Sequence, residues 1–178
     1  MRFADTRQPS ARPAPRVEPV IIFLVGGETY AIAASAVLEI GSTDGMSGVA
    51  SPFSHPAIPK VRHTLQRGRR IYYVVNACTY FHSAPSRPSM VLLLCGSRTA
   101  VLVDRIERMT DIAGLWELPQ AFAGEERGWY RGLARLGERV IPMVNPASFL
   151  TNSEIALLEE AGGGVYAKSS VSREHATP

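Results

Sequence analysis

The apolar residues of the chain fall into short runs separated by glycine and proline. The first run, residues 19–25, is apolar at both sets of alternating positions, which predicts a β-strand buried on both faces. Gly26 and Gly27 follow it, and glycine readily adopts the positive φ angles of a two-residue hairpin turn. Residues 29–33 are apolar again. We therefore predict that the folded part opens with a β-hairpin.

This pattern returns at a fixed offset of 69 residues. Residues 23–40 align with residues 92–109, and residues 68–81 align with residues 137–150. Two separated blocks that share one offset indicate an internal duplication, and two copies are too few for a solenoid. The two halves are therefore predicted to be built alike.

Each half also has a second hairpin, which turns at Gly68 in the first half and at Gly137 in the second. Residues 69–76 and 139–145 are the predicted return strands. Residues 41–60 mix Gly, Ser and Pro without periodicity and are predicted to form a long loop.

The two ends of the chain lack this strand pattern. Residues 1–18 are rich in Pro, Arg and Ala, which predicts a disordered arm. Thr151 and Glu154 form a capping box that predicts the start of a short helix. We expect Gly162 and the two glycines after it to end that helix, and residues 165–178 to be disordered.

Short strands with frequent turns and no sustained helical period favour an all-β barrel or sandwich. The duplication favours two similar small barrels. The predicted division of the chain is an arm at 1–18, a domain at 19–150 with halves at about 19–82 and 88–150, and a short helix with a disordered tail at 151–178.

Composition adds little to this picture. Of the 178 residues, 46% are hydrophobic and 20% are charged, as in an ordinary globular protein. No apolar run approaches the roughly 18–20 residues that span a bilayer, and the N-terminus lacks the apolar region of a secretory signal, so we expect a cytoplasmic protein. Cys78 and Cys95 belong to no metal-binding pattern, so neither a metal nor a cofactor is expected.

No residue pattern predicts catalysis. The sequence lacks a GxSxG motif, an HExxH motif and a phosphate-binding glycine loop. Asp104 and Glu107 are three residues apart on one predicted strand, so they face opposite sides and make a poor acid–base pair. We therefore predict that the protein is not an enzyme.

The most basic stretch, residues 62–70, suggests an alternative function. Arginines contact phosphates and aromatic rings stack on bases, so this stretch with Tyr72 and Tyr73 could belong to a basic β-barrel that binds RNA or single-stranded DNA. However, adjacent tyrosines on a strand point to opposite faces, which leaves one at most as an exposed platform. The net charge is only +3, so a solvated basic loop is favoured over nucleic-acid binding.

Four motifs stand in a fixed order along the chain. They are FLxGxExYAI at 23–32, the Arg67-Gly68 turn before IYYVVN at 71–76, AVLVDxIxxM at 100–109, and YxGLAxLGxRVIPMVN at 130–145. Each motif is weak alone, but their order and spacing resemble the CheW-like family of chemosensory adaptors. The resemblance covers roughly residues 19–150.

The resemblance implies an all-β fold of two SH3-like five-stranded β-barrel subdomains packed over a shared core, with short helical segments. It also implies a non-catalytic signalling adaptor of a chemotaxis or related pathway. The implied partners are a CheA-type histidine kinase and the cytoplasmic tip of a methyl-accepting chemoreceptor, without membrane insertion.

Two binding surfaces follow from the resemblance. The arginine of the family's hairpin turn matches Arg67, so the candidate receptor-binding residues are Arg67, Gly68 and Arg69. The segment after the second strand matches the family's Val-x-Glu-Ile pattern, so the candidate kinase-binding residues are Val37, Glu39 and Ile40. Burial of Val37 and Ile40 in the core is an equally good interpretation of that segment.

Overall fold

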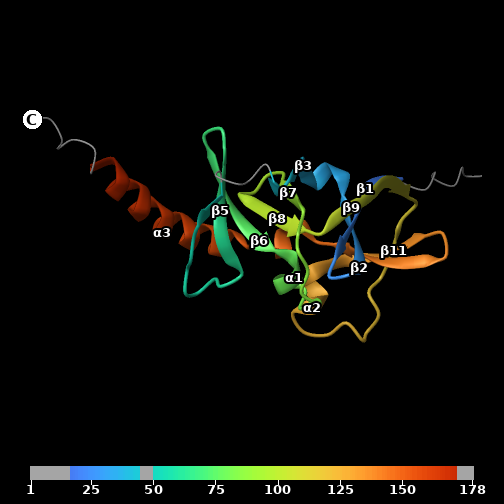
Figure 1. Ribbon diagram of the computed structural model, residues 1–178. Coiled ribbons are helices and arrows are strands. Elements are labelled where there is room, and N and C mark those ends of the chain that lie inside the picture. The colour runs from blue at the N-terminus through green and yellow to red at the C-terminus, as the bar shows by residue number, and fades with distance from the viewer. Residues whose placement is uncertain (1–16, 45–49, 172–178) are drawn as a thin grey trace, which may run out of the picture.

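Two six-stranded sheets make up the body of the protein in the computed structural model, which describes residues 17–44 and 50–171 (Figure 1). Sheet A has the order β10 (Leu115–Trp116), β11 (Tyr130–Leu136), β12 (Arg139–Val144), β2 (Glu28–Ala33), β1 (Glu18–Val25), β9 (Arg105–Ile112). Sheet B has the order β3 (Val37–Ser42), β7 (Met90–Leu94), β8 (Thr99–Val103), β6 (Arg70–Asn76), β5 (Val61–Arg67), β4 (Ala50–Pro52). The helical segments are η1 (Ala34–Ala36), α1 (Ala77–Tyr80), α2 (Glu126–Trp129), η3 (Pro146–Ser148) and α3 (Asn152–Val171).

Each sheet takes strands from both sequence repeats. The β1–β2 hairpin of the first repeat lies between β9 and β12 of the second, and the β7–β8 hairpin of the second lies between β3 and β6 of the first. The junction is a parallel strand pair in both sheets: Met143 lies opposite Ala31 in sheet A, and Val74 lies opposite Ala100 in sheet B. The 69-residue offset relates these two pairs to each other. The sheets are therefore two copies of one arrangement in which the repeats have exchanged hairpins.

This exchange changes the predicted architecture. Among the described residues each sheet has six strands instead of five, and its first and last strands do not pair with each other, so no closed barrel forms. The mostly-β class and the short helical segments are as predicted, although α3 is longer than expected. Each sheet is completed by a hairpin of the other repeat. The chain therefore does not divide into two self-contained barrels.

Strand β1 is buried on both faces, as its apolar pattern predicts. Ile21, Phe23 and Val25 belong to the largest core cluster, which contains residues of both sheets. Val20 and Ile22 belong to a second cluster that consists mainly of sheet A residues. Successive side chains of a strand point to opposite faces, so β1 joins the shared core to the separate core of sheet A.

The two repeats end in matching caps. The side-chain oxygen of Asn76 accepts a hydrogen bond from the Cys78 N–H at 2.9 Å, and that of Asn145 accepts one from the Ala147 N–H at 3.3 Å. Asparagine is a favoured N-cap because its side chain satisfies an amide that the helix leaves unpaired. The caps start α1 and η3, which position Tyr80 and Phe149 at equivalent places.

The predicted arm is shorter than expected, because Glu18 belongs to the folded domain. It is the first residue of β1, lies opposite Ile112 of β9, and its carboxylate accepts a hydrogen bond from Arg131 at 2.8 Å. Residues 1–16 and 172–178 lie outside the described residues. They make up most of the two segments that the sequence predicts to be disordered.

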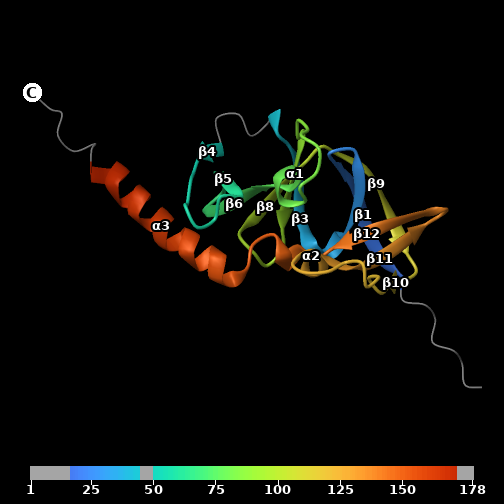
Figure 2. The same ribbon diagram turned by 90° about the horizontal axis from the view of Figure 1, so that it is seen from below.

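Helix α3 begins with the predicted capping box. The Thr151 N–H donates to Glu154 Oε2 at 2.8 Å, and the Glu154 N–H donates to Thr151 Oγ1 at 3.2 Å. The predicted end at Gly162 is wrong, because the helix runs to Val171. Glycine costs a helix about 1 kcal/mol but, unlike proline, does not clash with the preceding turn. Leu158 near the start of the helix is fully buried in the main core, and beyond it the helix extends away from both sheets (Figures 1 and 2). No described helix is long and apolar enough to cross a membrane.

Candidate functional site

Strand β3 is an edge of sheet B that presents apolar side chains to solvent. It pairs only with β7 among the described strands, so its other side has no strand neighbour. Leu38 is 57% exposed and Ile40 is 37% exposed, and Glu39 between them is also exposed. Large apolar side chains on an unpaired edge are unusual, because such edges invite association with another protein.

A bulge explains why three successive residues of β3 are exposed. The register of the β3–β7 pair shifts between Val37, opposite Leu94, and Glu39, opposite Leu93. The extra residue, Leu38, breaks the normal alternation of buried and exposed positions. Val37 is half-buried and packs against the main core, whereas Ile40 is exposed. Burial is therefore the correct interpretation of Val37 only.

The hairpin between β5 and β6 carries the second set of candidate residues. Arg67 ends β5 opposite Arg70, which leaves Gly68 and Arg69 as the two-residue turn. Gly68 has a φ of +58°, which glycine adopts without strain at the first position of such turns. Arg69 therefore lies at the tip, and Arg67 lies on the strand next to it.

The structure brings the two predicted sets together through an ion pair. Arg67 Nε donates to Glu39 Oε1 at 3.2 Å, with the side chains 30% and 45% exposed. A Cβ at Gly41 of β3 would lie 3.8 Å from the Arg67 guanidinium, which is an ordinary contact distance, and 3.3 Å from Val91, which is tight. Sequence reasoning assigned Arg67 and Glu39 to different partners, yet they form one continuous surface.

This ion pair orients side chains more than it stabilises the fold. An exposed arginine–carboxylate pair contributes about 0.2–1 kcal/mol, because water screens the charges. Strands β3 and β5 are not neighbours in sheet B, so the pair links an edge strand to a hairpin across the curved sheet. It therefore holds Arg67 against β3, the strand on which Leu38 and Ile40 are exposed.

Leu38 is the residue that sequence reasoning missed at this site. The Val-x-Glu-Ile pattern treats position 38 as variable, although Leu38 is the most exposed apolar side chain of β3. No sequence pattern marks it, because its exposure depends on the bulge that is set by the pairing with β7.

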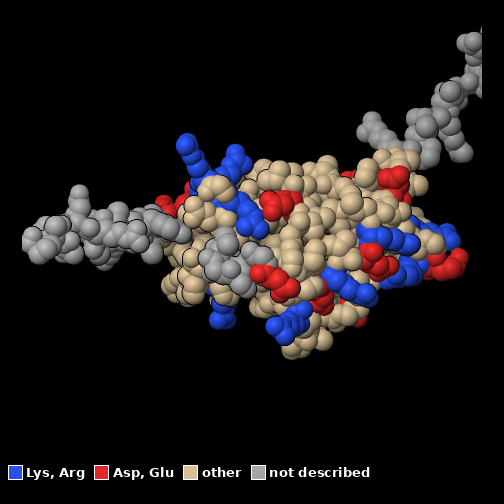
Figure 3. Space-filling view, turned by 45° about the horizontal axis from the view of Figure 1, so that its top comes forward, with Lys and Arg blue, Asp and Glu red and all other residues tan. Residues whose placement is uncertain are grey.

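The surface does not favour nucleic-acid binding. Tyr72 and Tyr73 are both 97% buried, so neither offers a platform on which a base could stack. One arginine of the basic stretch, Arg67, is paired with Glu39. Basic and acidic side chains are also interspersed on the face shown in Figure 3. No uniformly basic stripe is visible on that face.

Asp104, from the third sequence motif, has a structural role. Its Oδ2 accepts a hydrogen bond from the Gly26 N–H at 2.7 Å, and its Oδ1 accepts one from the Ser86 hydroxyl. Ser86 Oγ also lies 3.0 Å from the sulfur of Cys78. The network ties the β1–β2 turn to the segment that joins the repeats. Within the described residues, no three His, Cys, Asp or Glu side chains are grouped so that they could hold a metal ion.

Comparisons with known proteins bear on the family and the fold of the chain. A family model described as "CheW-like domain" matches residues 19–154. The crystal structure of the scaffolding protein TtCheW from Thermoanaerobacter tengcongensis superposes with a TM-score of 0.65, at 16% sequence identity, over 80% of this chain and 99% of that one. At that identity the likeness concerns the fold. No curated protein matches the sequence.

Proposed function

Because the chain belongs to the CheW-like domain family, we propose that it is a non-catalytic adaptor that couples a CheA-type histidine kinase to the cytoplasmic tips of chemoreceptors. Such an adaptor needs two protein-binding surfaces and no active site. It holds both partners at a high effective concentration, so that modest affinities suffice. Its place in the cell is the cytoplasm, at membrane-associated receptor arrays.

The edge of β3 is the proposed kinase-binding surface. The observation that carries this proposal is the exposed pair Leu38 and Ile40 around Glu39 on a sheet edge with no strand neighbour. Interface centres are rich in apolar side chains and poor in charge, and β3 has this composition. Val37 supports the surface from below by packing against the core.

The β5–β6 hairpin is the proposed receptor-binding surface. Arg67, Gly68 and Arg69 form its end, and Arg67 keeps 30% of its side chain exposed while it is paired. The planar guanidinium makes several donor contacts at once, so it suits an interface anchor. Arg69 lies at the tip and is expected to contribute less, as a rim charge.

The Arg67–Glu39 ion pair makes the two proposed surfaces dependent on each other. A receptor group that takes the Arg67 guanidinium frees the Glu39 carboxylate for a kinase contact. The coupling is limited to the small free energy of an exposed ion pair, about 0.2–1 kcal/mol. It therefore adjusts the affinity for the second partner by a few-fold at most.

A pull-down from native lysate tests the proposal. We expect a CheA-type kinase to co-purify with the protein, and a purified receptor fragment to join the same complex. The Leu38→Glu variant should lose the kinase, and Met109→Glu, at the matching position to Ile40 in the second repeat, should retain it. If neither partner co-purifies with the wild-type protein, the adaptor function is wrong. Binding to single-stranded nucleic acid that falls steeply with salt would favour the alternative instead.

A further inference from the structure

A cavity of about 890 Å³ opens where the two repeats meet, at the far end of β5 from Arg67. Residues 60 to 67 span about 20 Å along a strand, so the cavity is separate from the surface described above. Lys60 and Trp129 occupy equivalent positions of the two repeats, as do Thr79 and Ser148, and all four line the cavity. The site is thus built jointly by both repeats, and the proposed adaptor function does not use it.

One wall of the cavity is aromatic. The ring centroid of Trp129 lies 5.0 Å from that of Tyr80 and 5.8 Å from that of His82. His82 follows α1 with a φ of +52°, a conformation uncommon for a residue other than glycine. Trp129 is half-buried, so part of its ring remains available. The wall therefore offers ring surface mainly from Trp129 and His82, since Tyr80 is only 8% exposed.

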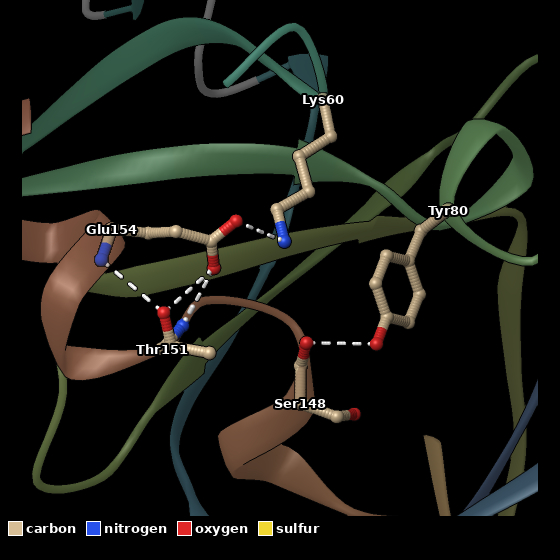
Figure 4. A network of polar contacts seen from close by, with 5 residues as sticks. All are labelled: Lys60, Tyr80, Ser148, Thr151 and Glu154. Atoms are coloured by element: carbon tan, nitrogen blue, oxygen red, sulfur yellow. Dashed lines mark hydrogen bonds and ion pairs between the residues drawn. The ribbon is translucent and has the colours of Figure 1, made fainter. Parts of the chain in front are cut away.

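The cationic side chains that line the cavity, Lys60 and Arg62, already interact with other groups of the protein. Lys60 Nζ lies 2.8 Å from Glu154 Oε1 and 5.5 Å from the centre of the Tyr80 ring (Figure 4). Partial burial of Glu154 disfavours its charged form, but the hydrogen bonds from Lys60 and Thr151 outweigh burial and lower its pKa. Arg62 Nε donates to the Pro59 carbonyl at 3.2 Å. Glu125, which also lines the cavity, makes no ion pair within the part of the chain that the structure describes.

We propose that this cavity binds the proline- and arginine-rich segment 9–16 of the chain's own N-terminus, PSARPAPR. Proline-rich segments bind aromatic-lined grooves as extended polyproline II helices, with little entropy lost because proline is already restricted. Trp129, Tyr80 and His82 supply such a groove. The carboxylate of Glu125 is the partner for an arginine of the segment, and the cation of Arg62, which also lines the cavity, sets the direction in which the segment binds.

The segment is long enough to reach the cavity from where it leaves the domain. The described chain starts at Val17. Segment 9–16 directly precedes Val17, and its eight residues span about 25 Å in the polyproline II conformation. Glu18 contacts Arg131 at 2.8 Å, and Arg131 is two residues from Trp129, so the aromatic wall lies within that span of the start of β1. A tethered segment has an effective concentration of the order of millimolar. A dissociation constant of about 1 mM for the segment would therefore leave the cavity occupied in half of the molecules.

Fluorine NMR on the full-length protein tests this proposal. The chain has two tryptophans, so 5-fluorotryptophan gives one signal from Trp129 in the cavity and one from Trp116 on β10, which is exposed and lies outside the cavity. We expect the double variant Pro13→Ser/Pro15→Ser to shift the Trp129 signal and leave the Trp116 signal in place. The matched variant Ala4→Ser/Ala11→Ser keeps the prolines and should shift neither signal.

A double-mutant comparison tests the arginine contact. Glu125→Gln should shift the Trp129 signal more in the natural sequence than in the Pro13→Ser/Pro15→Ser variant. Glu117 is an exposed carboxylate outside the cavity, so Glu117→Gln should have the same effect on the signal in both backgrounds. An unchanged Trp129 signal in the proline variant overturns the proposal, as does an equal shift of both tryptophans. A Trp129 shift that appears only as the protein concentration rises assigns the cavity to the segment of a second copy, which overturns binding within one chain.

Discussion

The two sheets carry the same kind of ion pair at positions that the duplication does not relate. In sheet B, Glu39 of β3 binds Arg67; in sheet A, Glu107 of β9 binds Arg139 at 3.2 Å. The repeat offset aligns Arg67 with Leu136, not with Arg139. Each pair nevertheless joins an edge strand to a hairpin across its curved sheet. The shared geometry, rather than inherited residues, accounts for both pairs.

The residues around the two pairs differ in a way that bears on function. On β3, the exposed Leu38 and Ile40 flank a single charge, Glu39. On β9, Glu107 is followed by Arg108 before the exposed Met109. Charge is depleted at interface centres, so the β3 edge has the composition of a docking surface and the β9 edge has that of a solvated one. Of the two duplicated edges, the β3 edge is therefore the more apolar and the β9 edge the more charged.

The largest effect is expected in the core, at the equivalent positions Tyr80 and Phe149. The Phe149 ring is fully buried, so Phe149→Ala should lower the free energy of unfolding by about 3–5 kcal/mol. Urea denaturation followed by circular dichroism measures this change. Tyr80→Phe is the matched variant that keeps a ring and should cost far less. Similar losses for the two variants would contradict the full burial of the Phe149 ring in the core.

The next effect concerns the β5–β6 hairpin. Arg67→Ala should weaken binding of a receptor tip by about 1–3 kcal/mol, because it removes an interface anchor, and leave kinase binding in place. Arg69→Ala should cost less than about 1 kcal/mol, as expected of a rim charge. Arg139→Ala, in the ion pair of the other sheet, is the control and should leave receptor binding unchanged. Calorimetry measures all three, and a dominant effect of Arg69 would reverse the roles assigned to the hairpin.

A smaller effect is expected on the β3 edge. Glu39→Arg places two cations together beside the exposed apolar pair, and it should weaken kinase binding roughly tenfold, or about 1.4 kcal/mol, without unfolding the protein. Glu107→Arg makes the same change in the other ion pair and should have no effect on kinase binding. Unchanged binding of a well-folded Glu39→Arg variant would remove β3 from the interface.

The smallest effect is expected at Tyr80, whose hydroxyl donates to the Ser148 carbonyl at 2.7 Å. Tyr80→Phe should lower the free energy of unfolding by about 1 kcal/mol at neutral pH. Burial disfavours the phenolate and raises the pKa of Tyr80 to about 12 from 10.0. The folded pKa exceeds the unfolded one, so this stabilisation is complete below pH 10 and is lost as the pH rises towards 12. Unfolding curves at pH 7 and between pH 10 and 12 should show a smaller alkaline loss in the variant.

The sequence predicted the local structure well and the strand pairing poorly. Strands β5 and β11 each have seven residues at the predicted offset, and their turn glycines have φ angles of +58° and +62°. The duplication itself hid the exchange of hairpins. Strands β1 and β7 have similar apolar sequences. The local sequence therefore does not indicate whether each strand pairs with strands of its own repeat or of the other repeat.

At the candidate site, too, single residues were predictable from the sequence but contacts between distant segments were not. The resemblance identified Arg67 and Glu39 separately, but their contact depends on the curvature of sheet B, which no short motif encodes. The exposure of Leu38 depends on a bulge whose position is set by pairing with β7. Both features arise between segments far apart in the chain, where sequence patterns carry little information.

The exchange of hairpins also sets the order in which the protein can fold as it is made. Strand β1 ends at Val25, and its partner β9 begins only at Arg105. At a synthesis rate of about 5–20 residues per second, the first hairpin waits roughly 4–16 s for that partner. During this interval its unpaired edge is open to β9 of a neighbouring nascent chain. A high expression level, which raises the concentration of nascent chains, should therefore yield dimers that have swapped their first hairpins, and a lower expression level should reduce them.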